Sequence, residues 1–316
     1  MNSKNAIETQ GLTKRYDEDV LAVDGVDLAI PINSIYALLG PNGAGKTTTV
    51  SLLTTLIKPT DGTAKIAGFD VVKQAGEVRS RIGVTFQEIV LDPDLTGRES
   101  LDFHGRLYSM SKPKREAKIK ELLQLVELED AADRRTNMYS GGMKRRLELA
   151  RGLMTEPDVL FLDEPTQGLD PQNRANIWEY IRNLQANSNI TLLLTTHYMD
   201  EAEALADQVG IIDNGRFIAE GAPQELINEM GADVFQIEGS GNQEAFIDQI
   251  KQLPFVQAVN TNNDMMQISA GEGSGRLVEI VKASQAVDFQ IKEVSLAKPT
   301  LGDVFLKYTG RQLRDK

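Results

Sequence analysis

The 316-residue chain contains no cysteine, only two histidines and a single tryptophan. Without cysteine there can be neither disulfide bonds nor thiolate metal sites, a composition that fits the cytoplasm. No apolar run approaches the roughly 20 residues that a membrane-spanning helix needs. The start, MNSKNAIETQ, lacks the apolar stretch of a secretory signal. We therefore expect a soluble, intracellular globular protein.

Positive charge is also scarce. Lysine and arginine number 34 against 46 aspartates and glutamates, so the net charge is −12 and the sequence pI is about 4.8. Proteins that bind nucleic acid in general are usually basic, because they neutralise phosphates. The charge balance therefore argues against general nucleic-acid binding, although a chain with this net charge can still carry a local basic patch. The length suffices for one large domain or two smaller ones.

A glycine-rich segment, GPNGAGKT, follows the apolar run IYALL at 35–39. The run predicts a buried strand, and a helix is expected from about Lys46 to Ile57. The segment between fits GxxxxGK[ST], the pattern of a phosphate-binding loop. Its glycines let backbone N–H groups face phosphate oxygens, Lys46 would reach the β- and γ-phosphates, and Thr47 would bind Mg²⁺. A chance match is the alternative, which the strand and the helix make the poorer explanation. The predicted nucleotide-binding residues here are Gly40, Pro41, Asn42, Gly43, Ala44, Gly45, Lys46, Thr47 and Thr48.

Two adjacent carboxylates end a second apolar run, VLFLDE at 159–164. A central parallel strand of an α/β sheet ends in this way, at the sheet edge where ligands bind. Asp163 would complete the Mg²⁺ coordination, and Glu164 would polarise a water molecule for attack on the γ-phosphate. Solvated acids at an ordinary strand end are the alternative. Beside a phosphate loop we favour the catalytic interpretation.

Two further strand ends carry polar side chains. NITLLLTTH ends at His197, which would donate a hydrogen bond to the γ-phosphate. RIGVTFQ ends at Gln87, whose amide would contact the metal ion or the attacking water. A lone glutamine after a strand usually has no such role. The prediction for Gln87 therefore depends on the neighbouring motifs.

The stretch YSGGMKRR begins a predicted helix at 143–154. Ser140 occupies the N-cap position, and Gly141 and Gly142 leave nearby backbone N–H groups uncovered. Such a helix start attracts anions, phosphate above all. Taken alone, a serine-capped helix after a turn is the simpler interpretation.

In their order along residues 7 to about 230, these motifs resemble the ATP-binding subunits of ABC transporters. The resemblance implies an α/β P-loop NTPase fold with a helical insertion at about 88–155, and ATP and Mg²⁺ as cofactors. It also implies that two copies form a head-to-tail homodimer, in which residues 140–142 of one chain contact the γ-phosphate bound to the other. The residues that the resemblance assigns to the nucleotide or the metal, beyond the phosphate loop, are Tyr16 (stacked on adenine), Gln87, Ser140, Gly141, Gly142, Asp163, Glu164, Asp170 and His197.

Two positions depart from the usual Leu-Ser-Gly-Gly-Gln of that family, with Tyr139 for leucine and Met143 for glutamine. Met143 cannot make the polar contacts of glutamine. This variant, together with FQEIVLDPDLTGRESLDFHGRLY, resembles the daunorubicin-resistance exporter branch. That branch implies a separate membrane permease of the ABC-2 type, which would hold the chain on the inner face of the cell membrane. The segment at 88–101, rich in turn residues, would form part of the groove for the permease.

Residues 1–230 are thus expected to form the ATP-binding domain and residues 231–316 a C-terminal accessory domain. The second part predicts the order strand, helix, strand, strand, helix, strand, with a turn at Asn263 and Asp264, as in ferredoxin-like domains. A last helix, capped near Gly310, would follow. No phosphate loop or metal cluster is evident there, so a regulatory or dimer-supporting role is expected.

The leading hypothesis for function is an ATPase that powers a membrane exporter of drugs or other small amphipathic molecules. The alternative is a soluble ABC ATPase that acts on nucleic acid or ribosomes. One phosphate loop per chain, no long coiled coil and the acidic charge disfavour the alternative. A non-catalytic nucleotide-binding scaffold is a third possibility, which Glu164 disfavours.

Overall fold

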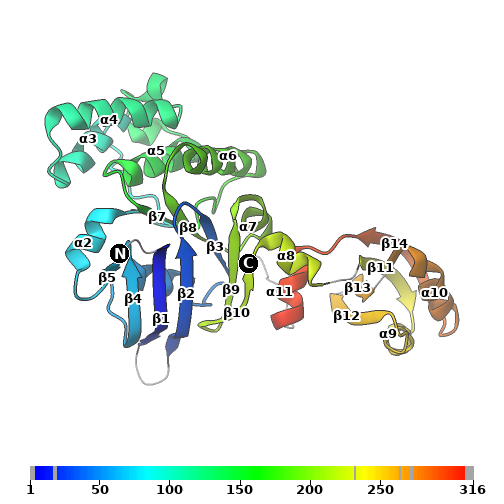
Figure 1. Cartoon of the computed structure of the whole chain (residues 1–316). Coiled ribbons are helices and arrows are strands. Elements are labelled where there is room, and N and C mark those ends of the chain that lie inside the picture. The colour runs from blue at the N-terminus through cyan, green and yellow to red at the C-terminus, as the bar shows by residue number, and fades with distance from the viewer. Residues whose placement is uncertain (1–3, 17–19, 231–232, 263–264, 271–272, 310–316) are drawn as a thin grey trace. The chain divides into compact units, whose positions relative to one another are not determined.

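The computed structural model describes residues 4–16, 20–230, 233–262, 265–270 and 273–309 (Figure 1). These residues form two compact units that divide after Pro223, a few residues before the boundary expected at 230. Asn263, Asp264 and Gly310, which the sequence analysis assigns to a turn and a helix cap, lie outside the described residues. In the described part of the chain no helix is both long and apolar enough to cross a membrane.

A six-stranded sheet forms the centre of the first unit, in the order β10-β9-β3-β8-β7-β6. Its strands are parallel except β10, which pairs antiparallel with β9. Every residue of β3, β7 and β8 is buried, which explains their continuous apolar sequences. The bounds are β3 Ile35–Leu39, β6 Ile82–Thr85, β7 Val159–Asp163, β8 Thr191–Thr196, β9 Gln208–Asp213 and β10 Arg216–Gly221.

An antiparallel sheet, in the order β2-β1-β4-β5, packs against the central sheet through a shared core. Its strands are β1 Asn5–Arg15, β2 Leu21–Pro31, β4 Asp61–Ile66 and β5 Phe69–Asp70. Figure 1 shows these strands beside the central ones. The core between the sheets includes Leu12, Ile30, Leu52, Phe161 and Leu193.

Helices occupy most of the segment between β6 and β7. Helix α3 begins with a capping box, in which the side chain of Thr96 accepts from the Glu99 N–H and Glu99 accepts from the Thr96 N–H. Helices α3, α4 and α5 lie together at the top of Figure 1. The helices of the first unit are α1 Lys46–Leu53, α2 Ala75–Arg81, α3 Gly97–Leu107, α4 Lys112–Leu125, α5 Gly141–Leu153, α6 Pro171–Asn187 and α7 Met199–Leu205, with 3₁₀ turns η1 Glu129–Ala131 and η2 Thr136–Met138.

Two local predictions have different outcomes. Helix α1 ends at Leu53, so its expected end at Ile57 is wrong; Thr55 adopts a positive φ of 66° that a helix cannot continue through. The hairpin expected around Asn214 and Gly215 is confirmed, because β9 and β10 pair on either side of these residues. Both have positive φ, as a tight hairpin turn requires.

The second unit contains a four-stranded antiparallel sheet, in the order β12-β13-β11-β14. Its core includes the rings of Phe246 and Phe289, which stack with centroids 4.6 Å apart. The elements that follow the first unit are α8 Pro223–Asn228, β11 Asp233–Gly241, α9 Gln243–Lys251, β12 Val256–Asn262, β13 Met265–Ala270, α10 Gly273–Gln285, β14 Phe289–Ala297 and α11 Leu301–Thr309.

Candidate nucleotide-binding and hydrolysis site

The phosphate loop, residues 40–47, connects the buried strand β3 to helix α1. Gly43 and Gly45 have φ of 81° and 104°, values that favour glycine. A Cβ on Gly40 would lie 2.3 Å from the carbonyl oxygen of Ile212, and one on Gly45 would lie 2.3 Å from that of Ala22. Helix α1 has no side chain capping its N-terminus. Its first N–H groups are therefore available to an anion at this end of the helix.

Lys46 is 5% exposed and turns back over the loop. Its Nζ donates to the carbonyl oxygens of Gly40 at 2.7 Å and Pro41 at 3.2 Å, and lies 3.4 Å from Glu164 Oε1. Burial lowers the pKa of Lys46, while the carboxylate of Glu164 works against this shift. The structure thus brings together the lysine of the phosphate loop and the carboxylate that directly follows β7.

Thr195 in β8 holds both carboxylate residues in place. Its Oγ1 donates to Asp163 Oδ1 at 2.5 Å and accepts the backbone N–H of Glu164 at 3.0 Å. Burial raises the pKa of Asp163, against hydrogen bonds to Thr195 and Thr47 that lower it. The influence of Thr47 on this pKa indicates that the two expected metal ligands lie close together. Sequence reasoning missed Thr195, although a threonine inside an apolar strand run is a signal that could have found it.

The Glu164 carboxylate lies between two basic side chains. Its Oε2 is 3.0 Å from His197 Nδ1, outside hydrogen-bonding geometry, and its Oε1 faces Lys46. Burial alone would raise the pKa of Glu164, but contact with His197 and the charge of Lys46 hold it below its ordinary value of 4.5. The carboxylate is therefore ionised at neutral pH, as a proton acceptor must be. Because the folded pKa is lowered, these contacts stabilise the fold above pH 4.5 and are lost as the pH falls further.

We expect Thr195→Val to lower the free energy of unfolding by about 1–3 kcal/mol, because Asp163 Oδ1 loses a buried hydrogen bond. The same variant should need more Mg²⁺ for half-maximal ATPase activity, because Asp163 is no longer held toward Thr47. Urea unfolding and a Mg²⁺ titration would measure both. Thr9→Val is the matched control: its buried Oγ1 donates to the Val26 carbonyl, away from this site. An unchanged Mg²⁺ requirement in Thr195→Val would refute the role given to Thr195.

Three other predicted residues lie elsewhere or make different contacts. Gln87 is exposed, and its Nε2 donates to Gln167 Oε1 at 2.7 Å. Tyr16 is 42% exposed, with Lys14 Nζ 5.2 Å from its ring centroid. Asp170 caps helix α6, where its two oxygens accept the backbone N–H and side-chain amide of Asn173. The structure thus gives Asp170 a capping function.

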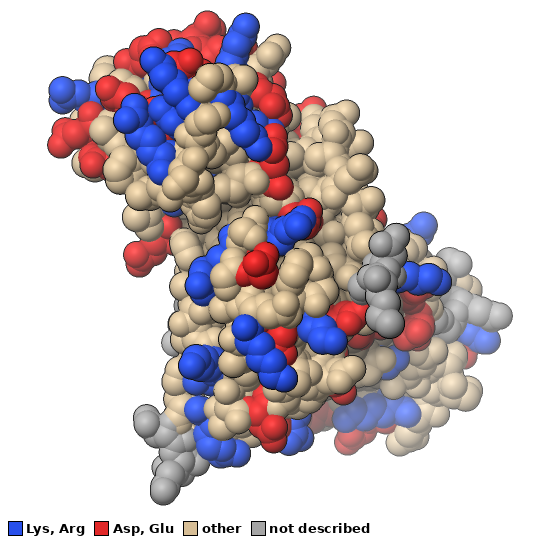
Figure 2. All heavy atoms as spheres, turned by 60° about the vertical axis from the view of Figure 1, so that its left-hand side comes forward, with Lys and Arg blue, Asp and Glu red and all other residues tan. Residues whose placement is uncertain are grey.

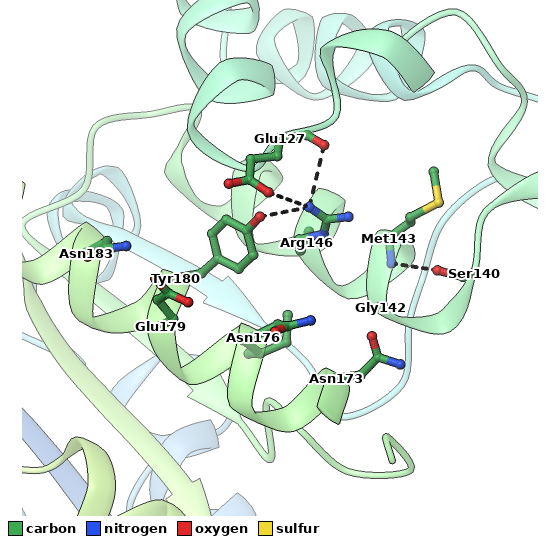
Figure 3. Close-up of a pocket in the computed structure, with 11 residues that line it drawn as sticks. Glu127, Ser140, Gly142, Met143, Arg146, Asn173, Asn176, Glu179, Tyr180 and Asn183 are labelled. Carbon is green, nitrogen blue, oxygen red and sulfur yellow. Dashed lines mark hydrogen bonds and ion pairs between the residues drawn. The ribbon is translucent and has the colours of Figure 1, made fainter. Parts of the chain in front are cut away.

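Ser140 is the N-cap of α5, as predicted, and its Oγ accepts the N–H of Met143 at 3.3 Å. With Gly142 it lines a pocket of about 280 Å³ between α5 and α6 (Figure 3). Arg146 crosses this pocket and donates to Tyr180 Oη at 2.8 Å. None of the described residues of the phosphate loop lines it. Within one chain, Ser140 and Lys46 therefore do not line the same pocket.

The comparisons with known proteins agree with this geometry. A family model described as "ABC transporter" matches residues 23–167. Over 314 residues, 98% of either chain, the sequence is 41% identical to the daunorubicin resistance ATP-binding protein DrrA3 of Streptomyces coeruleorubidus. The chain belongs to the ABC transporter ATP-binding proteins.

This ABC ATP-binding protein is also 42% identical to the Nod factor export ATP-binding protein I of Paraburkholderia xenovorans, over 98% of its length and 99% of that protein. Its fold is similar to a dimeric structure of the cassette MJ0796 in a post-hydrolysis state with ADP and Pi, with a TM-score of 0.61 and 27% identity. That comparison covers 68% of this chain and 98% of the other. The protein is therefore an ATPase with the α/β fold of P-loop NTPases, and its hydrolysis serves a membrane transporter.

Proposed function

We propose that this protein powers an exporter of drugs or other small amphipathic molecules by binding and hydrolysing ATP between two copies of itself. The observation that carries the proposal is the convergence of Lys46, Asp163 and Glu164 at one edge of the central sheet. In this account Lys46 binds the γ-phosphate, Glu164 accepts a proton from the attacking water, and His197 contacts both Glu164 and the phosphate. The phosphate loop supplies backbone N–H groups to the other phosphate oxygens.

Mg²⁺ fits the residues beside the phosphate loop. The side chains of Thr47 and Asp163 are close enough for Thr47 to lower the pKa of Asp163, and Mg²⁺ in phosphate sites typically uses one or two protein oxygens, phosphate oxygens and water. Bound there, the ion would neutralise charge on the β- and γ-phosphates. No group of three or more His, Cys, Asp or Glu side chains suited to a metal exists among the described residues. The site therefore suits an ion that comes with ATP. Gln87 would reach the ion after leaving Gln167.

Residues 140–142 would complete the site in trans. Ser140 and Gly142 line the pocket between α5 and α6, which no described residue of the same chain's phosphate loop lines. A head-to-tail dimer would place them over the γ-phosphate bound to the partner copy, with Tyr16 against adenine. Support comes from the dimeric structure of the related cassette MJ0796.

Export is supported by the relatives named for daunorubicin resistance and Nod factor export. The partner in this proposal is a separate permease of the ABC-2 type, as the resemblance in the sequence implies. The permease would hold the protein on the cytoplasmic side of the membrane. The rival function, an ABC ATPase on nucleic acid, gains no support from these names. On the face shown in Figure 2, Lys and Arg side chains are interspersed with Asp and Glu and form no continuous basic surface.

The second unit fits a ferredoxin-like accessory module. Its strand order, β12-β13-β11-β14, and its alternation of strands and helices support this assignment. In this proposal the module supports the dimer or regulates it, and the ATPase site lies wholly in the first unit.

The permease would dock in an apolar groove beside the segment that follows Gln87. The groove has a volume of about 530 Å³ and is formed by that segment and α3. Several of its side chains are large, apolar and exposed, a property typical of docking surfaces. The groove includes Val90, Leu91, Leu95, Phe103, His104 and Leu107.

We expect Leu91→Cys and Leu95→Cys to crosslink to a coexpressed permease carrying a cysteine in its cytoplasmic helix, in an ATP-sensitive way. The chain has no native cysteine, so the background is clean. Ile32→Cys, which is exposed but outside the groove, is the control and should give no crosslink. Gel shifts with and without ATP would measure the yield. Crosslinks confined to cysteines in residues 231–316 would contradict docking in this groove.

A further inference from the structure

Three charged residues, Arg145, Glu148 and Arg151, follow one another on a single face of α5. Their spacing of three residues keeps them on the inner side of the helix. Arg145 is 3% exposed and Glu148 is fully buried, whereas an inward-facing helix position normally carries an apolar side chain. A buried guanidinium is costly unless its donors are satisfied. The contacts of Arg145 therefore need an explanation beyond packing.

The guanidinium of Arg145 binds four backbone carbonyl groups. Nε donates to Pro165 at 2.5 Å, and Nη2 donates to Glu164 at 2.5 Å and Asp163 at 3.3 Å. Nη1 donates to Phe86, the residue before Gln87, at 2.7 Å. Through these bonds Arg145 attaches two parts of the chain to helix α5. One is the turn at 163–165, and the other is Phe86, which follows strand β6. Lysine, with a single ammonium group, cannot reproduce this planar fork.

The other two residues extend the attachment along α5. Arg151 donates to the carbonyl oxygen of Val90 and, at 2.9 Å, to Glu148. The segment 86–90 is therefore fixed to α5 at both ends, by Arg145 and by Arg151. Val90 also lines the apolar groove. Hydrogen bonds from two arginines of α5 therefore connect this helix to the groove, through Val90, and to the turn that carries Glu164.

We infer that Arg145 is a positioning residue for ATP hydrolysis: it fixes the Glu164 turn, and Phe86 at the start of the segment 86–90, to helix α5, which Ser140 caps. The inference rests on the proposed function, in which Glu164 accepts the proton. In the described structure Glu164 has a positive φ of 48°, an uncommon conformation for a non-glycine residue. The bond from Arg145 to its carbonyl oxygen helps to hold this conformation. Release of the turn would move the carboxylate away from Lys46 and His197.

Arg145→Lys tests the inference, with Arg115→Lys as the matched control. Arg115 is also buried, at 6% exposed, and binds Asp102 and the Met110 carbonyl, away from the site. In Arg145→Lys we expect kcat to fall by about 10- to 100-fold, because misplacement by about 1 Å can cost that much. KM for MgATP should change less than about 3-fold, because the phosphate loop is unaltered. Arg115→Lys should lose stability but keep kcat within about 2-fold.

The split between kcat and KM separates positioning from general destabilisation. Arg145→Lys should lower kcat with little change in KM for MgATP, whereas Arg115→Lys should change neither. A folded Arg145→Lys protein with wild-type kcat, or one with only KM changed, would overturn the inference.

Two further experiments distinguish a failure of this inference from a failure of the proposed function. Glu164→Gln, assayed in parallel, tests the proposed function itself: turnover at the wild-type rate in that variant refutes Glu164 as proton acceptor, whatever Arg145→Lys does. Should Arg145→Lys not fold, hydrogen exchange on the wild-type protein decides. Peptides covering 84–92, 141–151 and 163–167 should change protection together when MgATP is added. Independent changes would overturn the inference.

Discussion

Glu164→Gln is expected to lower kcat for ATP hydrolysis by about 10²–10⁴-fold, the contribution typical of a general base. The glutamine side chain keeps the size of glutamate but cannot accept the proton of the attacking water. Lys46 and the phosphate loop remain, so ATP should still bind. The carboxylate of Glu164 lies 3.4 Å from Lys46 Nζ and 3.0 Å from His197 Nδ1, at the place where the γ-phosphate would arrive.

Single-turnover hydrolysis and equilibrium binding of a fluorescent ATP analogue would separate chemistry from binding. Glu201→Gln is the matched control. Glu201 is also buried, and its Oε1 accepts hydrogen bonds from Thr166 and Trp178 that a glutamine oxygen can keep. Its activity should stay within about 3-fold of wild type, as expected for a shape-conserving change with hydrogen bonds retained. Turnover near the wild-type rate in Glu164→Gln would assign the proton acceptor to another group.

Ser140→Arg is expected to abolish the ATP-dependent dimer. Ser140 caps α5 beside two glycines. A Cβ added to Gly142 would lie 3.0 Å from Asn173 Oδ1, so the start of the helix is closely packed. A long cationic side chain at the N-cap would fill the space that a second copy's γ-phosphate needs, and it would repel the positive end of the helix. With ATP, light scattering should therefore show dimers for Glu164→Gln and monomers for the double variant that carries both Glu164→Gln and Ser140→Arg.

Ser111→Arg is the control for that experiment. Ser111 is likewise a helix N-cap serine, at the start of α4, and it is exposed and away from the pocket of Figure 3. Its variant should still dimerise with ATP. Dimers that persist in Ser140→Arg, at the same ATP concentration, would show that residues 140–142 do not face the partner's nucleotide.

The sequence predicted those parts of the site that depend on short, continuous patterns. The phosphate loop follows a fully buried strand, and Asp163 ends another that Glu164 directly follows, as their apolar runs indicate. Parallel pairing of β3, β8 and β7 then brings these strand ends together. Hydrophobic periodicity and glycine spacing were sufficient to predict the phosphate loop and the two carboxylates at the strand end.

The contacts of Arg145, Thr195 and Gln87 could not be predicted, because they join each side chain to atoms far away in the chain. Arg145 binds Phe86, 59 positions away, and Thr195 binds Asp163, 32 positions away. Neither contact leaves a repeating pattern in the sequence. The hydrogen bond between Gln87 and Gln167 likewise depends on where two loops meet. The capping of α6 by Asp170 is a local contact, made to Asn173 three residues further on. Helix α1 ended early for a local reason, the positive φ of Thr55.

The most direct test of a site shared between two copies is a mixture of two inactive variants, Lys46→Ala and Ser140→Arg. In a head-to-tail dimer of the two, one site carries both defects, whereas the other pairs an intact phosphate loop with an intact Ser140. We therefore predict that ATPase activity, negligible for each variant alone, appears when the purified chains are mixed. No recovery in mixtures that contain the mixed dimer would contradict the account.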